Sequence, residues 1–94
     1  MAKWVLTARA QCNLVEIVDN VIQFTGYSAS GIRLYNELID HFHKIAFMPY
    51  GLGTDIGEGR RQTFCRKYRI IYRIWHDDIY ILTVIHSSRI YPRL

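Results

Sequence analysis

The hydrophobic pattern of this chain changes its period near Arg60, and that change restricts the fold more than any other feature. Before Arg60, apolar residues recur at steps of three and four, the spacing of one helical face. From Arg60 to His86 the helical period is lost, and β-branched and aromatic residues predominate, as in a sheet. The chain has 94 residues and is 50% hydrophobic. We therefore expect one folded domain over residues 1–94 rather than a disordered polymer.

A short strand and a first helix are predicted at the start of the chain. The strand is expected over residues 3–6, and Thr7 offers a side-chain oxygen as the N-cap of the helix. The helix is expected to end near Phe24, because Thr25 and Gly26 break its apolar pattern. Its apolar face consists of Leu14, Ile17, Val18, Val21 and Ile22.

A second helix is predicted after this break, and Pro49 is expected to end it. Ser28 or Ser30 is expected to cap its start. Its apolar stripe is expected at Ile32, Tyr35, Leu38, Ile39, Phe42, Ile45 and Ala46. Because the link between the helices is short and contains glycine, we expect an antiparallel hairpin. The glycine-rich residues 50–59 then predict an irregular surface loop.

A β-meander is predicted after this loop. Strands are expected at about 61–65, 68–75 and 79–86, with a turn at Asp77-Asp78 and a flexible tail over residues 87–94. The predicted fold class is α+β: an N-terminal strand, an antiparallel helical hairpin and a three-stranded antiparallel meander packed on the helices.

A two-residue turn at Asp77-Asp78 would fix which side chains share a face of the last hairpin. The face toward the helices would be apolar: Tyr68, Ile70, Tyr72, Ile74, Ile79, Ile81, Thr83 and Ile85. The outer face would mix cations with aromatic and aliphatic groups: Arg69, Ile71, Arg73, Trp75, Tyr80, Leu82, Val84 and His86. Such a mixture is typical of interface hot spots. The alternative is that residues 50–59 or the tail cover this patch as a second small core.

Charge and cysteine content leave the function open. Twelve Lys and Arg against eight Asp and Glu give a net charge of +4, which suits an anionic partner such as RNA or an acidic protein. Cys12, Cys65 and the histidines are not spaced as metal ligands, so no metal and no cofactor are expected. The sequence contains neither a signal peptide nor an apolar run of about 20 residues. We therefore expect a cytoplasmic protein that does not enter the membrane.

Four segments together resemble one family: Pro49-Tyr50-Gly51, Gly59-Arg60-Arg61, YRIIYRI at 68–74 and VIHSSR at 84–89. Over nearly the whole chain they are similar to the RelE/ParE toxin superfamily, and in particular to its ParE branch. The resemblance implies a bacterial toxin of a type II toxin–antitoxin system, of the plasmid-stabilisation kind, which a cognate antitoxin neutralises in a hetero-oligomer. ParE-like members inhibit DNA gyrase, whereas RelE-like members cut mRNA on the ribosome without a metal.

The residues at the RelE-type catalytic positions favour the gyrase inhibitor. Arg69 matches the arginine of the family's YR pair, but Gln62 stands where a catalytic lysine is expected, and Ser87 where an arginine would stabilise phosphate. A site that lacks preorganised cations loses orders of magnitude in the rate of phosphoryl transfer. Partner contacts are expected from Arg61, Arg73, Trp75, Tyr80, Leu82, Tyr91 and Arg93.

Two alternatives to gyrase inhibition remain open at this point. If the protein is a ribosome-dependent endoribonuclease, Arg69, His86 and Arg89 would carry the reaction, with His86 as general base. An ordinary hydrogen-bonding histidine at a strand end is the structural alternative for His86. The protein could also be an inactive relative that acts only in antitoxin binding and in autoregulation of its operon.

Overall fold

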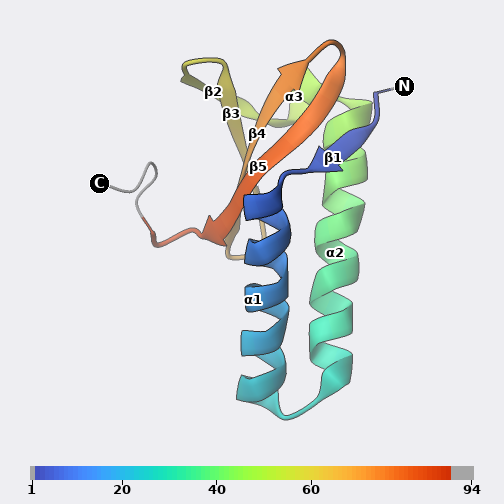
Figure 1. Ribbon diagram of the computed structural model, residues 1–94, viewed down its shortest axis with the longest axis vertical. Coiled ribbons are helices and arrows are strands. Elements are labelled where there is room, and N and C mark those ends of the chain that lie inside the picture. Colours follow the sequence, from blue (N-terminus) through green and yellow to red (C-terminus); the bar gives the residue numbers. More distant parts are fainter. Residues whose placement is uncertain (1, 90–94) are drawn as a thin grey trace.

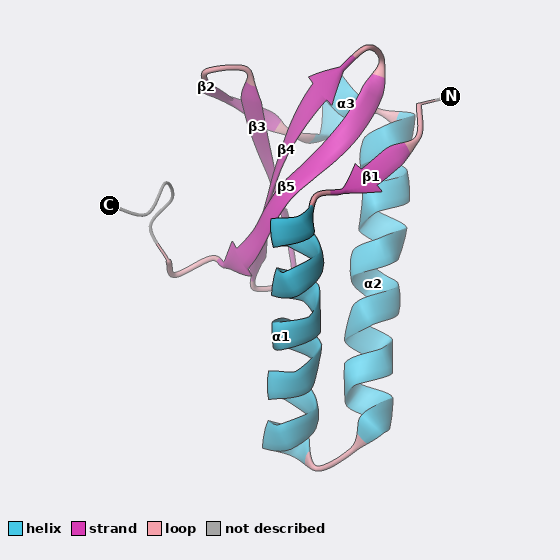
Figure 2. Cartoon of the chain, viewed as in Figure 1, coloured by secondary structure: helices cyan, strands magenta, loops and turns pink. Residues whose placement is uncertain are grey.

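A helical hairpin and a five-stranded sheet form two layers in the computed structural model, which describes residues 2–89 (Figure 1; Figure 2). The elements follow the chain as β1 (Trp4–Leu6), α1 (Ala8–Thr25), α2 (Ser28–Phe47), α3 (Pro49–Leu52), β2 (Thr54–Gly57), β3 (Arg60–Cys65), β4 (Tyr68–Trp75) and β5 (Asp78–His86). The α+β class, the helical hairpin and the meander packed on it are confirmed. The half of the hairpin near the α1–α2 link projects beyond the sheet (Figure 1).

The sheet contains one strand more than the sequence predicts. Its order is β1-β5-β4-β3-β2, with β1 parallel to β5 and the other neighbours antiparallel. Residues 50–59 are not an irregular loop, because they contain part of α3, the edge strand β2 and a turn. The turn residues Glu58 and Gly59 both have positive φ angles, 57° and 75°. The meander therefore has four strands, β2 to β5.

Arg61 holds the α3–β2 segment against the sheet. Its Nη2 donates hydrogen bonds to the carbonyl oxygens of Tyr50 (3.0 Å) and Gly53 (2.6 Å). The hydroxyl of Tyr72, which is fully buried, donates to the carbonyl oxygen of Pro49 (2.7 Å). The Tyr72 hydroxyl lies so close to Gly53 that a Cβ atom there would overlap it. These long-range contacts form β2, which the local sequence alone does not predict.

The helix ends confirm part of the capping prediction. Thr7 caps α1, since its Oγ1 accepts a hydrogen bond from the Ala10 N–H (3.3 Å), and Gly26 ends the helix in a left-handed conformation (φ 77°). Neither Ser28 nor Ser30 is the N-cap of α2, so that prediction is wrong. The N-cap is Tyr27, whose side chain makes no capping hydrogen bond.

The apolar stripe of α2 differs from the prediction over its first two turns. Leu38, Phe42, Ile45 and Ala46 are buried as expected, but Ile32 is 58% exposed and Tyr35 is 44% exposed. Gly31 and Leu34 are buried in their place. Gly31 packs so closely against Ile22 of α1 that a Cβ atom would not fit without a shift. This close contact decides which side of α2 faces α1 in the half of the hairpin that projects beyond the sheet.

The turn between β4 and β5 is formed by His76 and Asp77 rather than by Asp77 and Asp78. Both central residues have positive φ angles, 48° and 65°, as a two-residue hairpin turn of type I′ requires. Trp75 consequently pairs with Asp78, and Arg73 pairs with Tyr80. The predicted turn at Asp77-Asp78 would instead pair Trp75 with Tyr80, Arg73 with Leu82, Ile71 with Val84 and Arg69 with His86, and this register is wrong.

An irregularity at Leu82 changes the register of β5 a second time. Tyr72 pairs with Ile81 but Ile71 pairs with Thr83, so one extra residue is inserted into β5. Val84 then pairs with Ile70 and His86 with Tyr68 on the side of the helices, while Ile85 pairs with Arg69. The shift therefore exchanges the predicted faces of Val84, Ile85 and His86. Because paired residues share a face, Arg69, Ile71, Arg73 and Trp75 still lie on the outer face, as predicted.

A glycine substitution tests the close contact at the α3–β2 junction. Gly53→Ala should lower the free energy of unfolding by about 1–3 kcal/mol, because the added methyl group displaces the buried Tyr72 hydroxyl. Gly51→Ala is the matched control, since its Cβ would make only ordinary contact with Met48 (3.6 Å). Urea denaturation measures both values. Equal stability of the two variants would contradict the packing of Gly53 against Tyr72.

The pH dependence of stability tests the contact between α2 and β3. His41 lies half-buried, with its Nε2 3.1 Å from the Thr63 hydroxyl; burial and, to a lesser extent, the charge of Lys44 lower its pKa. Since the folded pKa lies below the unfolded value of about 6.5, His41 contributes stability above that value. This stability is lost as the pH falls through the folded pKa. Denaturation at neutral and acidic pH should show this loss of stability. The loss should be smaller in His41→Gln and unchanged in His76→Asn, a substitution in the β4–β5 turn.

Candidate functional site

The outer face of the sheet carries a surface that we call the arginine face. It contains side chains from three neighbouring strands that point away from the helices: Arg60, Gln62 and Phe64 of β3, Arg69, Ile71, Arg73 and Trp75 of β4, and Asp78 and Tyr80 of β5. The opposite positions of β4, Ile70 and Tyr72, belong to the hydrophobic core. The alternation of the strands therefore separates the arginine face from the core.

Arg69 contacts an aromatic ring and a carbonyl oxygen on this surface. Its guanidinium carbon is 5.7 Å from the centroid of the Phe64 ring, and its Nη2 donates a hydrogen bond to the Ser87 carbonyl oxygen (3.2 Å). Ile71, the next residue of β4 on this face, is fully buried. Arg69 is thus held at the end of β4 by a ring and a carbonyl, and the centre of the face is closely packed.

The other half of the arginine face is more open. Arg73 donates from Nη2 to the Glu58 carbonyl oxygen (3.1 Å), and Arg60 forms an ion pair with the Glu58 carboxylate (2.6 Å). Trp75 is 57% exposed, and its ring meets His76 edge to face at 4.8 Å. Residues 50–59 extend the sheet at its edge and do not cover this face, whereas most of the tail, the other segment named in the alternative of a second small core, lies outside the described residues.

The predicted partner-binding residues do not all lie on the arginine face. Arg73, Trp75 and Tyr80 lie there, but Arg61 pairs with Tyr72 and is turned toward α3. Leu82 is half-buried at the irregularity of β5. Tyr91 and Arg93 lie outside the described residues, as does most of the expected tail.

Sequence reasoning missed the three members of this face that β3 contributes, Arg60, Gln62 and Phe64. Their position follows from the turn at Arg66-Lys67, which pairs Cys65 with Tyr68 and therefore Phe64 with Arg69. A two-residue turn with two cations between β-rich segments was the available signal. The β3 side chains that point outward could have been assigned from this turn.

A cleft on the opposite side of the sheet contains His86 and Arg89. It has a volume of about 440 Å³ and lies between α1 and the end of β5, where Asn13, Glu16 and Asn20 face Tyr68 and His86. The Ser88 N–H donates to His86 Nδ1 (3.2 Å), which leaves the ring proton of the neutral imidazole on Nε2. The rings of Tyr68 and His86 meet edge to face at 5.8 Å.

The three residues expected to act together in a nuclease lie on two sides of the sheet. Arg69 belongs to the arginine face, whereas His86 and Arg89 line the cleft beside α1. A general base and the cation that stabilises a phosphorane must both reach one phosphate group. Arg69 and His86 do not converge on a common position in this arrangement.

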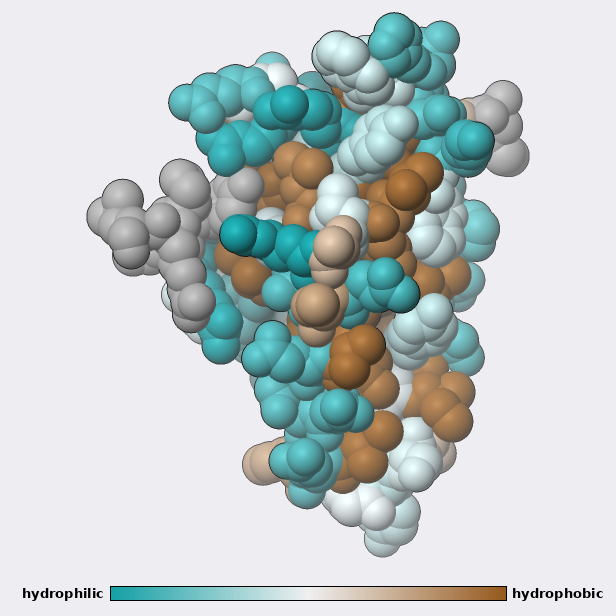
Figure 3. All heavy atoms as spheres, in the orientation of Figure 1, coloured by the Kyte–Doolittle hydropathy of each residue, from teal (hydrophilic) through white to brown (hydrophobic). Residues whose placement is uncertain are grey.

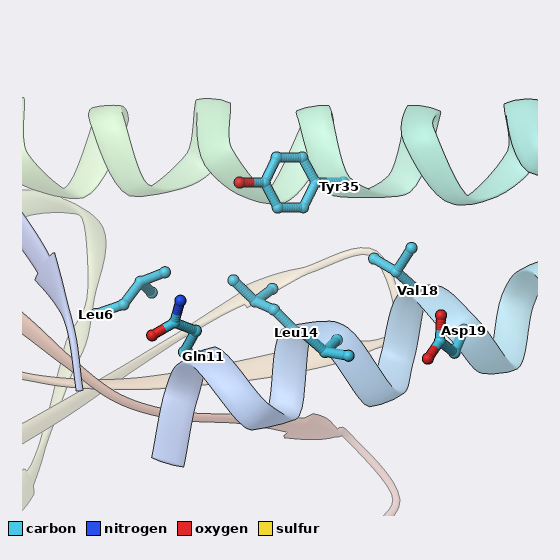
Figure 4. Close-up of a pocket in the computed structure, with 7 residues that line it drawn as sticks. Leu6, Gln11, Leu14, Val18, Asp19 and Tyr35 are labelled. Atoms are coloured by element: carbon cyan, nitrogen blue, oxygen red, sulfur yellow. The ribbon is translucent and has the colours of Figure 1, made fainter. Parts of the chain in front are cut away.

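An apolar groove runs between the two long helices. Figure 4 shows Leu14 and Val18 of α1 facing Tyr35 of α2, with Leu6 at one end. The groove has a volume of about 320 Å³, and Gln11, Val15 and Asp19 complete its lining. Apolar residues are visible between the helices on this side of the molecule (Figure 3). This side of the hairpin therefore offers apolar surface to a partner.

Two other features were sought among the described residues: a metal site and a membrane-spanning helix. Within residues 2–89, no three His, Cys, Asp or Glu side chains are grouped so that they could hold a metal ion. Neither long helix of this part of the chain has the length and apolar character needed to cross a membrane.

Comparison with known proteins identifies similar chains. The family model described as "ParE toxin of type II toxin-antitoxin system, parDE" matches residues 5–91. No curated protein sequence matches significantly. A solved chain of the chromosomal ParDE TA system from P. aeruginosa is 16% identical with a TM-score of 0.83, over 94% of this chain and 98% of that chain. A chain of the toxin–antitoxin complex RelBE2 from Mycobacterium tuberculosis is 19% identical with a TM-score of 0.69, over 90% and 96%. At these identities, the solved structures show a common fold.

Proposed function

Because the chain belongs to the family of ParE toxins of type II toxin–antitoxin systems, we propose that it inhibits DNA gyrase and that a cognate antitoxin neutralises it. The observation that carries the gyrase proposal is the arginine face, where Arg73 is exposed between β3 and β5 and Trp75 is exposed at the end of the β4–β5 hairpin. Arginine and tryptophan are the residues most enriched among interface hot spots. A toxin of this kind acts in the bacterial cytoplasm, where gyrase and its DNA are found.

The separation of the catalytic candidates supports a binding function over the nuclease alternative. Arg69 and His86 lie on opposite faces of the sheet, and Gln62 and Ser87 occupy positions where a RelE-like nuclease is expected to carry cations. A ribosome-bound nuclease would need several of these groups at one phosphate. The ribosomal alternative therefore requires a rearrangement that the gyrase proposal does not.

The groove between α1 and α2 supports an antitoxin partner. Val15 and Tyr35 on its rim are exposed, and Leu14 and Val18 form its apolar base. An apolar segment of an antitoxin could bury this surface, which the toxin alone leaves open to water. The arginine face lies on the other side of the sheet from the helices, so both partners have a surface of their own.

A supercoiling assay tests the gyrase proposal. The purified protein should block supercoiling of relaxed plasmid by gyrase or trap cleaved DNA, while mRNA on translating ribosomes stays intact. Trp75→Ala and Arg73→Glu should each weaken inhibition by roughly 1–3 kcal/mol of binding free energy, with little change in melting temperature. Tyr27→Ala and Arg33→Glu are matched controls, because both residues are exposed on the helical hairpin.

Three results distinguish the other functions. Cleavage of mRNA that His86→Ala abolishes, with gyrase unaffected, would establish the nuclease and overturn the gyrase proposal. Antitoxin binding without effect on either gyrase or ribosomes would identify a relative that acts only in autoregulation. A large loss of stability in Trp75→Ala with unchanged inhibition would make Trp75 a packing residue rather than a contact.

A further inference from the structure

Two guanidinium groups on the arginine face keep an unneutralised positive charge. Arg69 and Arg73 donate hydrogen bonds to the carbonyl oxygens of Ser87 and Glu58, which are neutral acceptors. Within residues 2–89, neither forms an ion pair with a carboxylate; the ion pairs are Arg60 with Glu58 and Arg66 with Glu37. The carbonyl contacts orient both groups without cancelling their charge. The face is therefore prepared for an anionic ligand.

Two aromatic rings on the same face are exposed to solvent. Phe64 is 50% exposed and Trp75 is 57% exposed, although both are large apolar side chains on a sheet surface. Neighbouring side chains orient both rings, since Arg69 lies at 5.7 Å from the Phe64 centroid and His76 meets Trp75 edge to face. Because Phe64 pairs with Arg69, six residues of β4 separate the two rings, or about 20 Å along the strand.

Cations and rings lie side by side at both ends of this length, on either side of the buried Ile71. From one end of β4 to the other, the face presents Phe64 beside Arg69, then Arg73 beside Tyr80, and then Trp75. Two carboxylates lie beside these residues: the Glu58 carboxylate binds Arg60, and Asp78, which pairs with Trp75, accepts a hydrogen bond from the Lys3 N–H (3.4 Å). A ligand that matches this face needs repeated negative charges together with flat, exposed rings.

We propose that the arginine face binds a single-stranded polynucleotide, with bases stacked on Phe64 and Trp75 and phosphates held by Arg69 and Arg73. Proteins that bind single strands without sequence preference combine a basic track with aromatic rings in this way. A duplex presents phosphates but hides the faces of its bases, and an acidic peptide presents charges without bases. The inference is independent of gyrase inhibition, because it concerns binding of the toxin alone to a polynucleotide.

Fluorescence anisotropy with labelled oligonucleotides of about 15 nucleotides tests this inference on the whole protein. The probes are oligo(dT), oligo(U) and a DNA duplex of the same length, with polyglutamate as competitor. Both single strands should bind more tightly than the duplex, and polyglutamate should compete poorly. Any preference between oligo(dT) and oligo(U) identifies which polymer the face favours.

Substitutions assign the binding to the two rings and the cations. Phe64→Ala and Trp75→Ala should each weaken binding of oligo(dT) about tenfold, whereas Tyr27→Ala, which removes an exposed ring from the hairpin, should not. Arg73→Ala should reduce the slope of log K against log salt by about 0.7, and Arg33→Ala should leave it unchanged. Thermal melting confirms that each variant is folded.

Three outcomes would overturn the inference while leaving gyrase inhibition open. The first is no binding of either oligo(dT) or oligo(U) at low salt by protein that still inhibits gyrase. The second is equal affinity for single strands and duplex, which would mean that charge alone attracts DNA. The third is a loss of affinity in Tyr27→Ala equal to that in Trp75→Ala.

Discussion

The pairing of β4 with β5 is the constraint on which the functional surfaces of this protein depend. The turn at His76 and Asp77 fixes the register near Trp75, and the extra residue at Leu82 shifts it again toward the end of the hairpin. The position of the turn changes each partner on β5 by two residues and so keeps it on the same face, whereas the single extra residue at Leu82 moves the following side chains to the other side of the sheet. The two shifts place Tyr80 beside Arg73 on the outer face and His86 beside Tyr68 on the side of α1.

Contacts distant in sequence extend this sheet and support its arginine face. Arg61 binds the carbonyl oxygens of Tyr50 and Gly53, and this anchors the segment that becomes β2. With β2 in place, β3 is flanked on both sides from Arg60 to Gln62, so the outward side chains of Arg60 and Gln62 stand on an interior part of the sheet. The core beneath consists of Tyr72 and its apolar neighbours. The arginine face is therefore rigid because the opposite face is closely packed.

Sequence patterns predicted the elements well where local chemistry decides them. Thr7 as a cap and Gly26 as a helix end follow from single residues, and the alternation in β4 correctly sent Arg69 and Arg73 outward. The turn residues could not be predicted, because His76-Asp77 and Asp77-Asp78 suit a hairpin equally and only the packing of both strands selects one. The predicted buried face of the first two turns of α2 was wrong. The close packing of Gly31 against Ile22, and not the apolar stripe, determines which residues of α2 face α1.

The residues of the candidate site could be predicted only where the predicted faces of β4 and β5 were correct. Arg73, Trp75 and Tyr80 share a face as expected, whereas His86 lies across the sheet from Arg69. One domain of this size thus offers three separate surfaces: the arginine face, the cleft at His86 and the groove between the helices. A toxin that must meet both its target and its inhibitor has use for such a separation.

Backbone NOEs from the unmodified protein in solution test the β4–β5 register most directly. The account predicts cross-strand NOEs that link Arg73 with Tyr80 and Tyr72 with Ile81, followed by NOEs that link Ile71 with Thr83. Cross-strand NOEs that link Arg73 with Leu82 and Arg69 with His86 would contradict it. They would return His86 to the arginine face and remove the separation on which the proposed functions rest.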